Sequence, residues 1–125
     1  MSEMSFKKVL VIETDLFFTT KIGQTLKEMG LEYLTASSSA EVFQLLGKNQ
    51  IVLVILDLCL EKMDTITLLE KLKSSDKTEG IPVIGFGEHT DSILNRARTI
   101  GCEIVVSNRN FVEHLKDLVE ASLAS

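Results

Sequence analysis

Three carboxylates that follow two apolar segments are the residues of this chain best suited to chemistry. Asp57 follows residues 51–56, six apolar residues of which four are β-branched, while Glu13 and Asp15 follow a second buried-type segment at residues 8–12. Apolar runs without alternation are typical of strands buried on both faces of a parallel sheet. Because open α/β sheets bind ligands at the carboxyl ends of such strands, we expect these three carboxylates to converge.

Carboxylates that share one cleft repel each other unless a cation or a proton offsets their charge. Ligands that are all oxygen, with room left for water and a phosphoryl group, suit Mg²⁺. The sequence therefore predicts a Mg²⁺ site at this edge. The alternative interpretation is that the three acids lie on surface loops, each separately solvated.

The elements that must position these residues alternate regularly along the chain. Between the strand-like segments, apolar residues recur at helical spacing and predict five helices. This alternation predicts an α/β fold, a doubly wound (flavodoxin-like) parallel sheet of five strands in the order 2-1-3-4-5 with five helices. We expect residues 1–125 to form a single domain. The strands are expected at residues 8–12, 31–35, 51–57, 81–86 and 103–106.

Helix ends are marked by residues that satisfy unpaired backbone groups or adopt left-handed backbone angles. The expected N-terminal caps are Ser38 with Glu41, Asp64, Thr90 or Asp91, and Asn110 with Glu113; the expected C-terminal residues are Gly30, Gly47 and Gly101.

Composition excludes several classes of function. With 18 acidic and 13 basic residues the formal net charge is −5, which argues against a nucleic-acid or anionic-membrane surface. No apolar run reaches the roughly 20 residues of a membrane span, and the first residues do not resemble a signal peptide. Cys59 and Cys102 have no metal-ligand spacing and make no disulfide framework. We expect a soluble, cytoplasmic protein.

Taken in order, these features resemble the receiver domain of two-component response regulators, the CheY-like family, from about residue 7 to residue 119. The resemblance depends on spacing along the whole domain rather than on one motif. The matching segments are Glu13-Thr14-Asp15, the strand ending at Asp57, Met63-Asp64, Ile81-Pro82-Val83 and Gly101-Cys102.

The resemblance implies that Asp57 accepts a phosphoryl group from a histidine kinase or phosphotransfer protein and that the chain is not itself an enzyme. Attack by a carboxylate on phosphorus needs Mg²⁺ and donors that orient the phosphoryl oxygens. By similarity, Glu13, Asp57 and the main-chain carbonyl of Cys59 would hold the metal, with Asp15 as a further candidate ligand.

The chain departs from the family pattern at the helper positions. Thr14 replaces the second acid, so we expect weak Mg²⁺ binding. Gly87 stands where a Ser or Thr hydroxyl contacts the phosphoryl group, and Glu88 replaces the small residue after it. The lysine position falls on Asn108 or Arg109, depending on the register, and Arg109 is the candidate that could still bind phosphate oxygens.

The switch position of the fifth strand, aromatic in the family, falls on Ile104 or Val105. Each preorganised donor that is lost typically costs about 3 kcal/mol of transition-state stabilisation, although such losses are not additive. The leading interpretation is therefore an atypical receiver that acts as a protein-interaction module, with a downstream signalling protein as a further partner class. The alternative is a fully working, Mg²⁺-dependent phosphoacceptor.

Three remoter interpretations are disfavoured, and one of them, a hydrolase of the aspartyl-phosphate type, would use a second acid and a lysine, although no clear lysine is placed for it. A flavodoxin-like cofactor binder would need a phosphate-binding first loop, but Glu13 and Asp15 repel phosphate and the chain has no Gly-rich loop. A thiol sensor at Cys59 is disfavoured because nearby carboxylates raise a thiol pKa. We expect both cysteines to serve as small apolar fillers.

Overall fold

The structure, a computed structural model, describes residues 7–88 and 92–124. Its centre is a sheet of five parallel strands in the order β2-β1-β3-β4-β5, as the sequence predicts. The strands are β1 (Lys7–Ile12), β2 (Glu32–Ala36), β3 (Gln50–Asp57), β4 (Val83–Gly87) and β5 (Ile104–Ser107).

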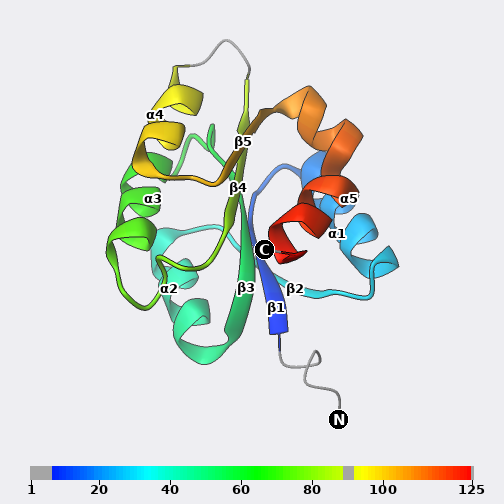
Figure 1. Cartoon of the computed structure of the whole chain (residues 1–125), viewed down its shortest axis with the longest axis horizontal. Helices are drawn as coiled ribbons and strands as arrows, with labels where there is room; N and C mark the ends of the chain where they lie inside the picture. Colours follow the sequence, from blue (N-terminus) through cyan, green and yellow to red (C-terminus); the bar gives the residue numbers. More distant parts are fainter. Residues whose placement is uncertain (1–6, 89–91, 125) are drawn as a thin grey trace.

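Helices cover both faces of the sheet (Figure 1). One layer contains α1 (Leu16–Glu28) and α5 (Asn108–Ala124), and the other contains α2 (Ser39–Lys48), α3 (Thr65–Ser74) and α4 (Ile93–Ile100). Among the described helices, none has the length and apolar character needed to cross a membrane.

The two central strands β1 and β3 bury side chains on both faces, which explains their unbroken apolar sequences. The side chains of residues 9–12 in β1 and 53–56 in β3 are each at most 1% exposed. Leu10, Ile12, Val54 and Leu56 pack in the layer of α2, α3 and α4, whereas Val9, Val11, Leu53 and Ile55 pack in the layer of α1 and α5.

Most of the expected helix ends are confirmed. Gly30 and Gly101 have φ angles of 74° and 113°, the left-handed conformation that glycine adopts without strain. Asp64 Oδ1 accepts a hydrogen bond from Thr67 N at the start of α3. Ser38 Oγ accepts one from Glu41 N, and α2 begins there as expected.

Two expected helix ends are wrong. Helix α2 continues through Gly47 to Lys48, and Asn49 is its C-cap. Helix α5 begins at Asn108 rather than after Asn110, because the last residue of β5, Ser107, places its Oγ where it accepts a hydrogen bond from Asn110 N (3.2 Å). Strand and helix therefore follow each other without a loop.

One further end lies outside the described residues. Thr90 and Asp91 were expected to cap α4 and are not among them, while Ser92 is the N-cap residue of the helix as described.

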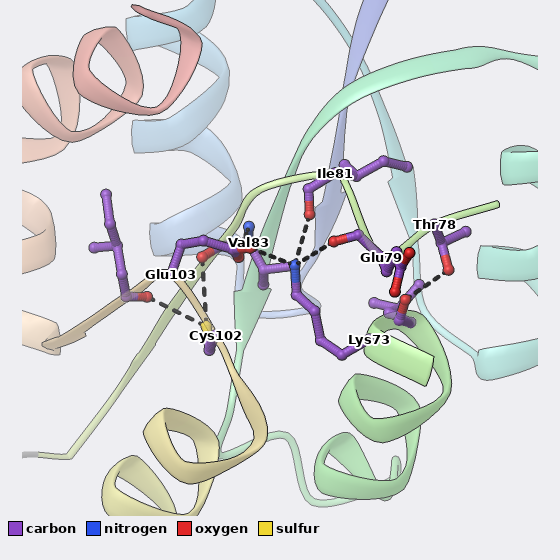
Figure 2. A network of polar contacts seen from close by, with 9 residues as sticks. Lys73, Thr78, Glu79, Ile81, Val83, Cys102 and Glu103 are labelled. Atoms are coloured by element: carbon purple, nitrogen blue, oxygen red, sulfur yellow. Dashed lines mark hydrogen bonds and ion pairs between the residues drawn. The ribbon is translucent and has the colours of Figure 1, made fainter. Parts of the chain in front are cut away.

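A polar network ties the amino-terminal ends of β4 and β5 to the end of α3 (Figure 2). The Lys73 side chain is only 9% exposed, and its Nζ donates to the carbonyls of Glu79 and Ile81 and pairs with Glu103 Oε2 (2.6 Å). Glu103 Oε1 accepts from Val83 N (2.9 Å). This network fixes the edge of the sheet opposite to the one where Asp57 lies.

Candidate functional site

A cavity of about 510 Å³ lies at the carboxyl ends of β1 and β3. It contains all three carboxylates that the sequence placed at this edge, together with side chains from the loops after β2 and β3. Its lining consists of Glu13, Thr14, Asp15, Ser37, Asp57, Cys59 and residues 60–63. The prediction that the three acids converge is confirmed at the level of this cavity.

Glu13 is the most constrained of the three acids, with only 3% of its surface exposed. Its Oε1 accepts hydrogen bonds from the backbone N–H groups of Thr14 (2.8 Å) and Asp15 (3.0 Å). Its Oε2 is buried and, within the described chain, has no hydrogen-bond partner as a carboxylate oxygen. Burial and then the adjacent Asp57 carboxyl raise the pKa of Glu13 from 4.5 to about 8. Without a cation, Glu13 is therefore largely protonated at neutral pH.

Asp57 is the last residue of β3 and is half-buried. Its Oδ1 accepts a hydrogen bond from Cys59 N (2.9 Å), which fixes the carboxyl group relative to the following loop. The loop is itself anchored, because Leu58 N donates to the carbonyl of Phe86 (2.8 Å) and Leu58 O accepts from the Thr65 hydroxyl (2.7 Å). These hydrogen bonds hold the Asp57 carboxyl group in the lining of the cavity.

Asp15 lines the cavity but has a structural task of its own. Its Oδ1 accepts hydrogen bonds from Phe17 N (2.8 Å) and Phe18 N (3.4 Å), so it is the N-cap of α1. Both acids commit one oxygen to backbone N–H groups, but Asp15 is exposed, whereas Glu13 is buried and keeps its other oxygen beside the Asp57 carboxyl. The structure therefore favours Glu13 over Asp15 as the acid that would share a cation with Asp57.

The carboxylate oxygens of this cavity fit a Mg²⁺ ion that is bound through few protein ligands. The orphaned Glu13 Oε2 beside the Asp57 carboxyl offers two hard oxygen ligands, and Mg²⁺ commonly binds through one or two carboxylates and keeps several waters. In the part of the chain that is described, no group of three or more His, Cys, Asp or Glu side chains is arranged to hold a metal. The weak Mg²⁺ binding that Thr14 leads us to expect stays a prediction.

The residues at the phosphoryl-contact positions lie apart from the cavity lining. Gly87 ends β4, pairs in register with Ser107, and contributes no side chain. Asn108 directly follows β5, and its Nδ2 donates to Glu88 Oε1 (2.9 Å). Which of Asn108 and Arg109 corresponds to the family's lysine stays a prediction, but Asn108 is the one that lies beside Glu88.

Arg109 points outward from the start of α5. Its side chain is 85% exposed, and its Nε pairs with Glu113 Oε1 (3.0 Å) one turn further along the helix. Among the described residues that line the cavity, Arg109 is not included. The geometry does not support a phosphoryl contact by this residue.

Three phenylalanine side chains pack together in the layer of α1 and α5, and Ile104, one candidate for the switch position, packs in the same layer. Ile104 and Val105 carry no ring, and both are half-buried in β5. Instead, Phe86 stacks on Phe111 with ring centroids 3.9 Å apart and an interplanar angle of 8°, and Phe18 packs beside Phe86. This cluster lies in the layer of α1 and α5 and joins the start of both helices to β4.

Ser37 and Lys62 are among the lining residues of the cavity that sequence reasoning missed. Ser37 follows the end of β2, and the expected order of the strands could have placed it at this edge. Lys62 is the one cationic residue in the lining as the described chain forms it. It lies in an irregular loop between Asp57 and Asp64, where no periodicity signals its direction.

Comparison with known proteins decides the family. Residues 9–120 match the family described as response regulator receiver domain. The chain belongs to this family. Receiver domains act in two-component signalling, so this is the pathway class of the chain.

Two curated relatives support this assignment. The chain is 37% identical over 81 residues to "Probable transcriptional regulator ycf29" of Porphyra purpurea, a match that covers 65% of the chain and 38% of that protein. It is 26% identical over 109 residues to the chemotaxis protein CheY of Treponema pallidum, covering 84% and 70%, respectively. The match thus spans well under half of the Porphyra protein.

Solved structures confirm the fold. The receiver domain of NtrX from Brucella abortus superposes with a TM-score of 0.84 at 20% identity, covering 94% of this chain and 99% of that one. The chemotaxis response regulator CheY4 of Vibrio cholerae gives a TM-score of 0.81 at 17% identity, covering 94% and 99%. The doubly wound architecture is therefore that of receiver domains.

Proposed function

We propose that this chain is an atypical receiver that signals as a protein-interaction module, with a binding surface that does not depend on the state of Asp57. The observation that carries the proposal is the position of Asn108. Of the two residues that could stand at the lysine position, Asn108 is an amide tied to Glu88, and Arg109 is exposed and paired with Glu113, so neither offers a free cation to a phosphoryl group. A dianion beside Asp57 would receive no cationic contact from β5.

The retained part of the site supports cation binding and slow acceptance of a phosphoryl group. Asp57 is oriented by Cys59 N, and Glu13 can hold Mg²⁺, which neutralises phosphoryl oxygens when it is bound. The missing hydroxyl at Gly87 and the missing lysine remove two preorganised contacts. Losses of about 3 kcal/mol for each such contact, not strictly additive, make modification inefficient.

The surface that we propose for partners is formed by α4, β5 and α5. A hollow of about 280 Å³ lies there, lined in part by Arg98, Val105 and Asn110. Arg98 Nη2 donates to the carbonyl of Val105 (3.4 Å), which joins α4 to β5 without any group from the Asp57 cavity. We propose a histidine kinase, a phosphotransfer protein or a downstream signalling protein as partner, in the cytoplasm, and no catalytic turnover by the chain itself.

A second candidate function, the fully working phosphoacceptor, is favoured by one observation. Lys62 lines the same cavity as Asp57 and could supply the cationic contact that β5 does not. In that case Asp57 would be phosphorylated at an ordinary rate, with its helper group taken from the loop after β3.

The two candidates are separated by adding Mg²⁺ with beryllofluoride, a phosphoryl mimic, and recording amide spectra and binding of a partner. The atypical receiver responds, if at all, only near residues 13–15 and 57–59, and partner binding is unchanged. A large change across α4 and β5 that Asp57→Asn abolishes would overturn the proposal in favour of the working switch. Incubation with a small phosphodonor, read by intact mass with Asp57→Asn as control, measures the modification itself.

A further inference from the structure

The end of β4 is closed over by side chains from two other elements. A Cβ atom added to Gly87 would lie 2.8 Å from Cys59 Sγ and 3.2 Å from Leu94 Cδ2. The first distance is shorter than real Cβ contacts, and the second already requires the neighbour to shift. Cys59 comes from the loop after Asp57, and Leu94 from the first turn of α4. The space for a side chain at residue 87 is therefore filled.

We propose that Cys59 is a steric plug that occupies the place of a side chain at residue 87 and packs the Asp57 loop and α4 into one arrangement. This inference deepens the proposed function, on which it depends for its signalling consequence. It assigns to Cys59 a positioning role in addition to its backbone contact with Asp57. The thiol takes part through its volume, and no chemical reaction of the sulfur is involved.

The backbone around Cys59 is fixed, so the plug is not easily displaced. Cys59 N donates to Asp57 Oδ1 (2.9 Å), and Leu58 is bonded through its N to Phe86 and through its O to the buried Thr65 hydroxyl. With the backbone held, Sγ can move only by rotation about χ1. Even after such a rotation, Leu94 would remain tight against a new Cβ.

The plug also explains why α4 would not respond to Asp57. Asp57 Oδ1 accepts a hydrogen bond from Cys59 N, so a change at this carboxyl acts first on Cys59. Cys59 Sγ and Leu94 Cδ2, however, both lie against the position of a Cβ at residue 87, and Leu94 is 4% exposed within the apolar layer of α2, α3 and α4. Closely packed interiors resist small displacements unless a second arrangement is available. With the space at residue 87 filled, the helix keeps one position.

The chain supplies a matched control two residues earlier on the same face of β4. A Cβ at Gly85 would lie 2.9 Å from Leu58 Cδ1 and 3.2 Å from Cys102 Sγ. Cys102 is 7% exposed and contacts the carbonyls of Val83 (3.4 Å) and Ile104 (3.3 Å). It thus presents the same chemistry to the same strand face, but it lies outside the Asp57 cavity as that cavity is described.

The first test is a double-mutant cycle on the unliganded protein, which does not depend on any signalling function. Gly87→Ser should lower the folded-to-unfolded equilibrium constant, measured by urea unfolding, by about tenfold or more, as overpacking does. In the Cys59→Ala background the same substitution should cost about threefold or less. Cys102→Ala should give no such relief.

If Gly87→Ser alone does not fold, recovery of a folded protein on adding Cys59→Ala supports the plug, and failure to recover overturns it. Equal costs in both backgrounds, or equal relief from Cys102→Ala, also overturn it. These results leave the proposed function unaffected.

The second test asks whether the plug keeps α4 unresponsive. Mg²⁺ with beryllofluoride is added to the wild type, to Cys59→Ala/Gly87→Ser and to Cys102→Ala/Gly87→Ser. We expect amide shifts across α4 in the first double variant only. No shift there, or the same shift in the control pair, overturns the plug as the cause. A shift across α4 in the wild type would instead overturn the proposed function, while the stability cycle would still stand.

Discussion

Glu13 is predicted to make the stability of the protein depend on pH in a direction unusual for a carboxylate. Its side chain is 3% exposed beside Asp57, and its pKa is raised to about 8. In the unfolded chain it returns to about 4.5. The folded protein therefore binds this proton more tightly than the unfolded chain does. The stabilisation is complete below pH 4.5 and is lost as the pH rises through about 8.

The size of the effect follows from the same values. A rise from 4.5 to about 8 corresponds to roughly 5 kcal/mol of preference for the protonated form, which is an upper limit. The cavity is wide enough for water to screen the carboxylate pair, so we expect about 2 kcal/mol. Glu13→Gln replaces the protonated acid by a neutral group of similar shape, and its amide can donate to Asp57.

The assay is urea unfolding of wild type and Glu13→Gln in the presence of a chelator at pH 5, 7 and 9. At pH 5 the two proteins should be about equally stable, and at pH 9 the variant should exceed the wild type by about 2 kcal/mol. Glu61→Gln, an exposed carboxylate in the lining of the same cavity, is the matched control and should leave the pH profile unchanged. A difference between wild type and Glu13→Gln that is constant from pH 5 to pH 9 would refute the reasoning.

Mg²⁺ provides a second arm of the same experiment. A cation binds the ionised form of Glu13, so a tenfold excess of Mg²⁺ over its dissociation constant should stabilise the wild type by about 1.4 kcal/mol at pH 9. The stabilisation should be smaller in Glu13→Gln. Equal stabilisation of both proteins would show that the cation binds elsewhere.

The remaining predictions concern single substitutions. Thr14→Asp places a second acid next to Glu13 and should tighten Mg²⁺ binding, measured by titration of amide shifts. Unchanged affinity would mean that residue 14 does not face the ion. Asp15→Ala removes the N-cap of α1 and should cost about 1 kcal/mol in urea unfolding, whereas no cost would show that the cap is dispensable. Lys73→Met removes the charged donor to the carbonyls of Glu79 and Ile81 and the ion-pair partner of Glu103 (Figure 2) and should cost about 2 kcal/mol, while the exposed Lys77→Met should cost little. Lys62→Ala should weaken binding of beryllofluoride with Mg²⁺ if that lysine contacts the phosphoryl position; equal affinity would argue against the working phosphoacceptor.

The sequence by itself determined the order of the strands, the alternation with helices and the edge at which Glu13 and Asp57 meet. These features depend on information that is local in the chain. Unbroken apolar runs identify strands buried on both faces, and parallel connections then bring the carboxyl ends of β1 and β3 together. The glycines that end α1 and α4 were equally readable, because only glycine adopts those backbone angles without strain.

What a side chain does at that edge depended on which backbone groups and side chains the folded chain places next to it. Asp15 follows the same strand as Glu13, yet it caps α1, because the first N–H groups of that helix point at it. Helix α5 begins at Asn108, since the Ser107 hydroxyl accepts a hydrogen bond from Asn110 N in its first turn. With the helix starting there, Asn108 contacts Glu88 and Arg109 is exposed to solvent.

Two decisive properties of the site arise only in three dimensions. The pKa of Glu13 is raised because folding removes it from water beside Asp57, 44 residues away along the chain (57 minus 13). The space at Gly87 is filled by two side chains that are distant from it or from each other in sequence. Cys59 comes from the loop after β3, and Leu94 comes from helix α4. Local patterns fix which face a residue occupies, but burial and the neighbours that fill a volume are set by the packing of the whole domain.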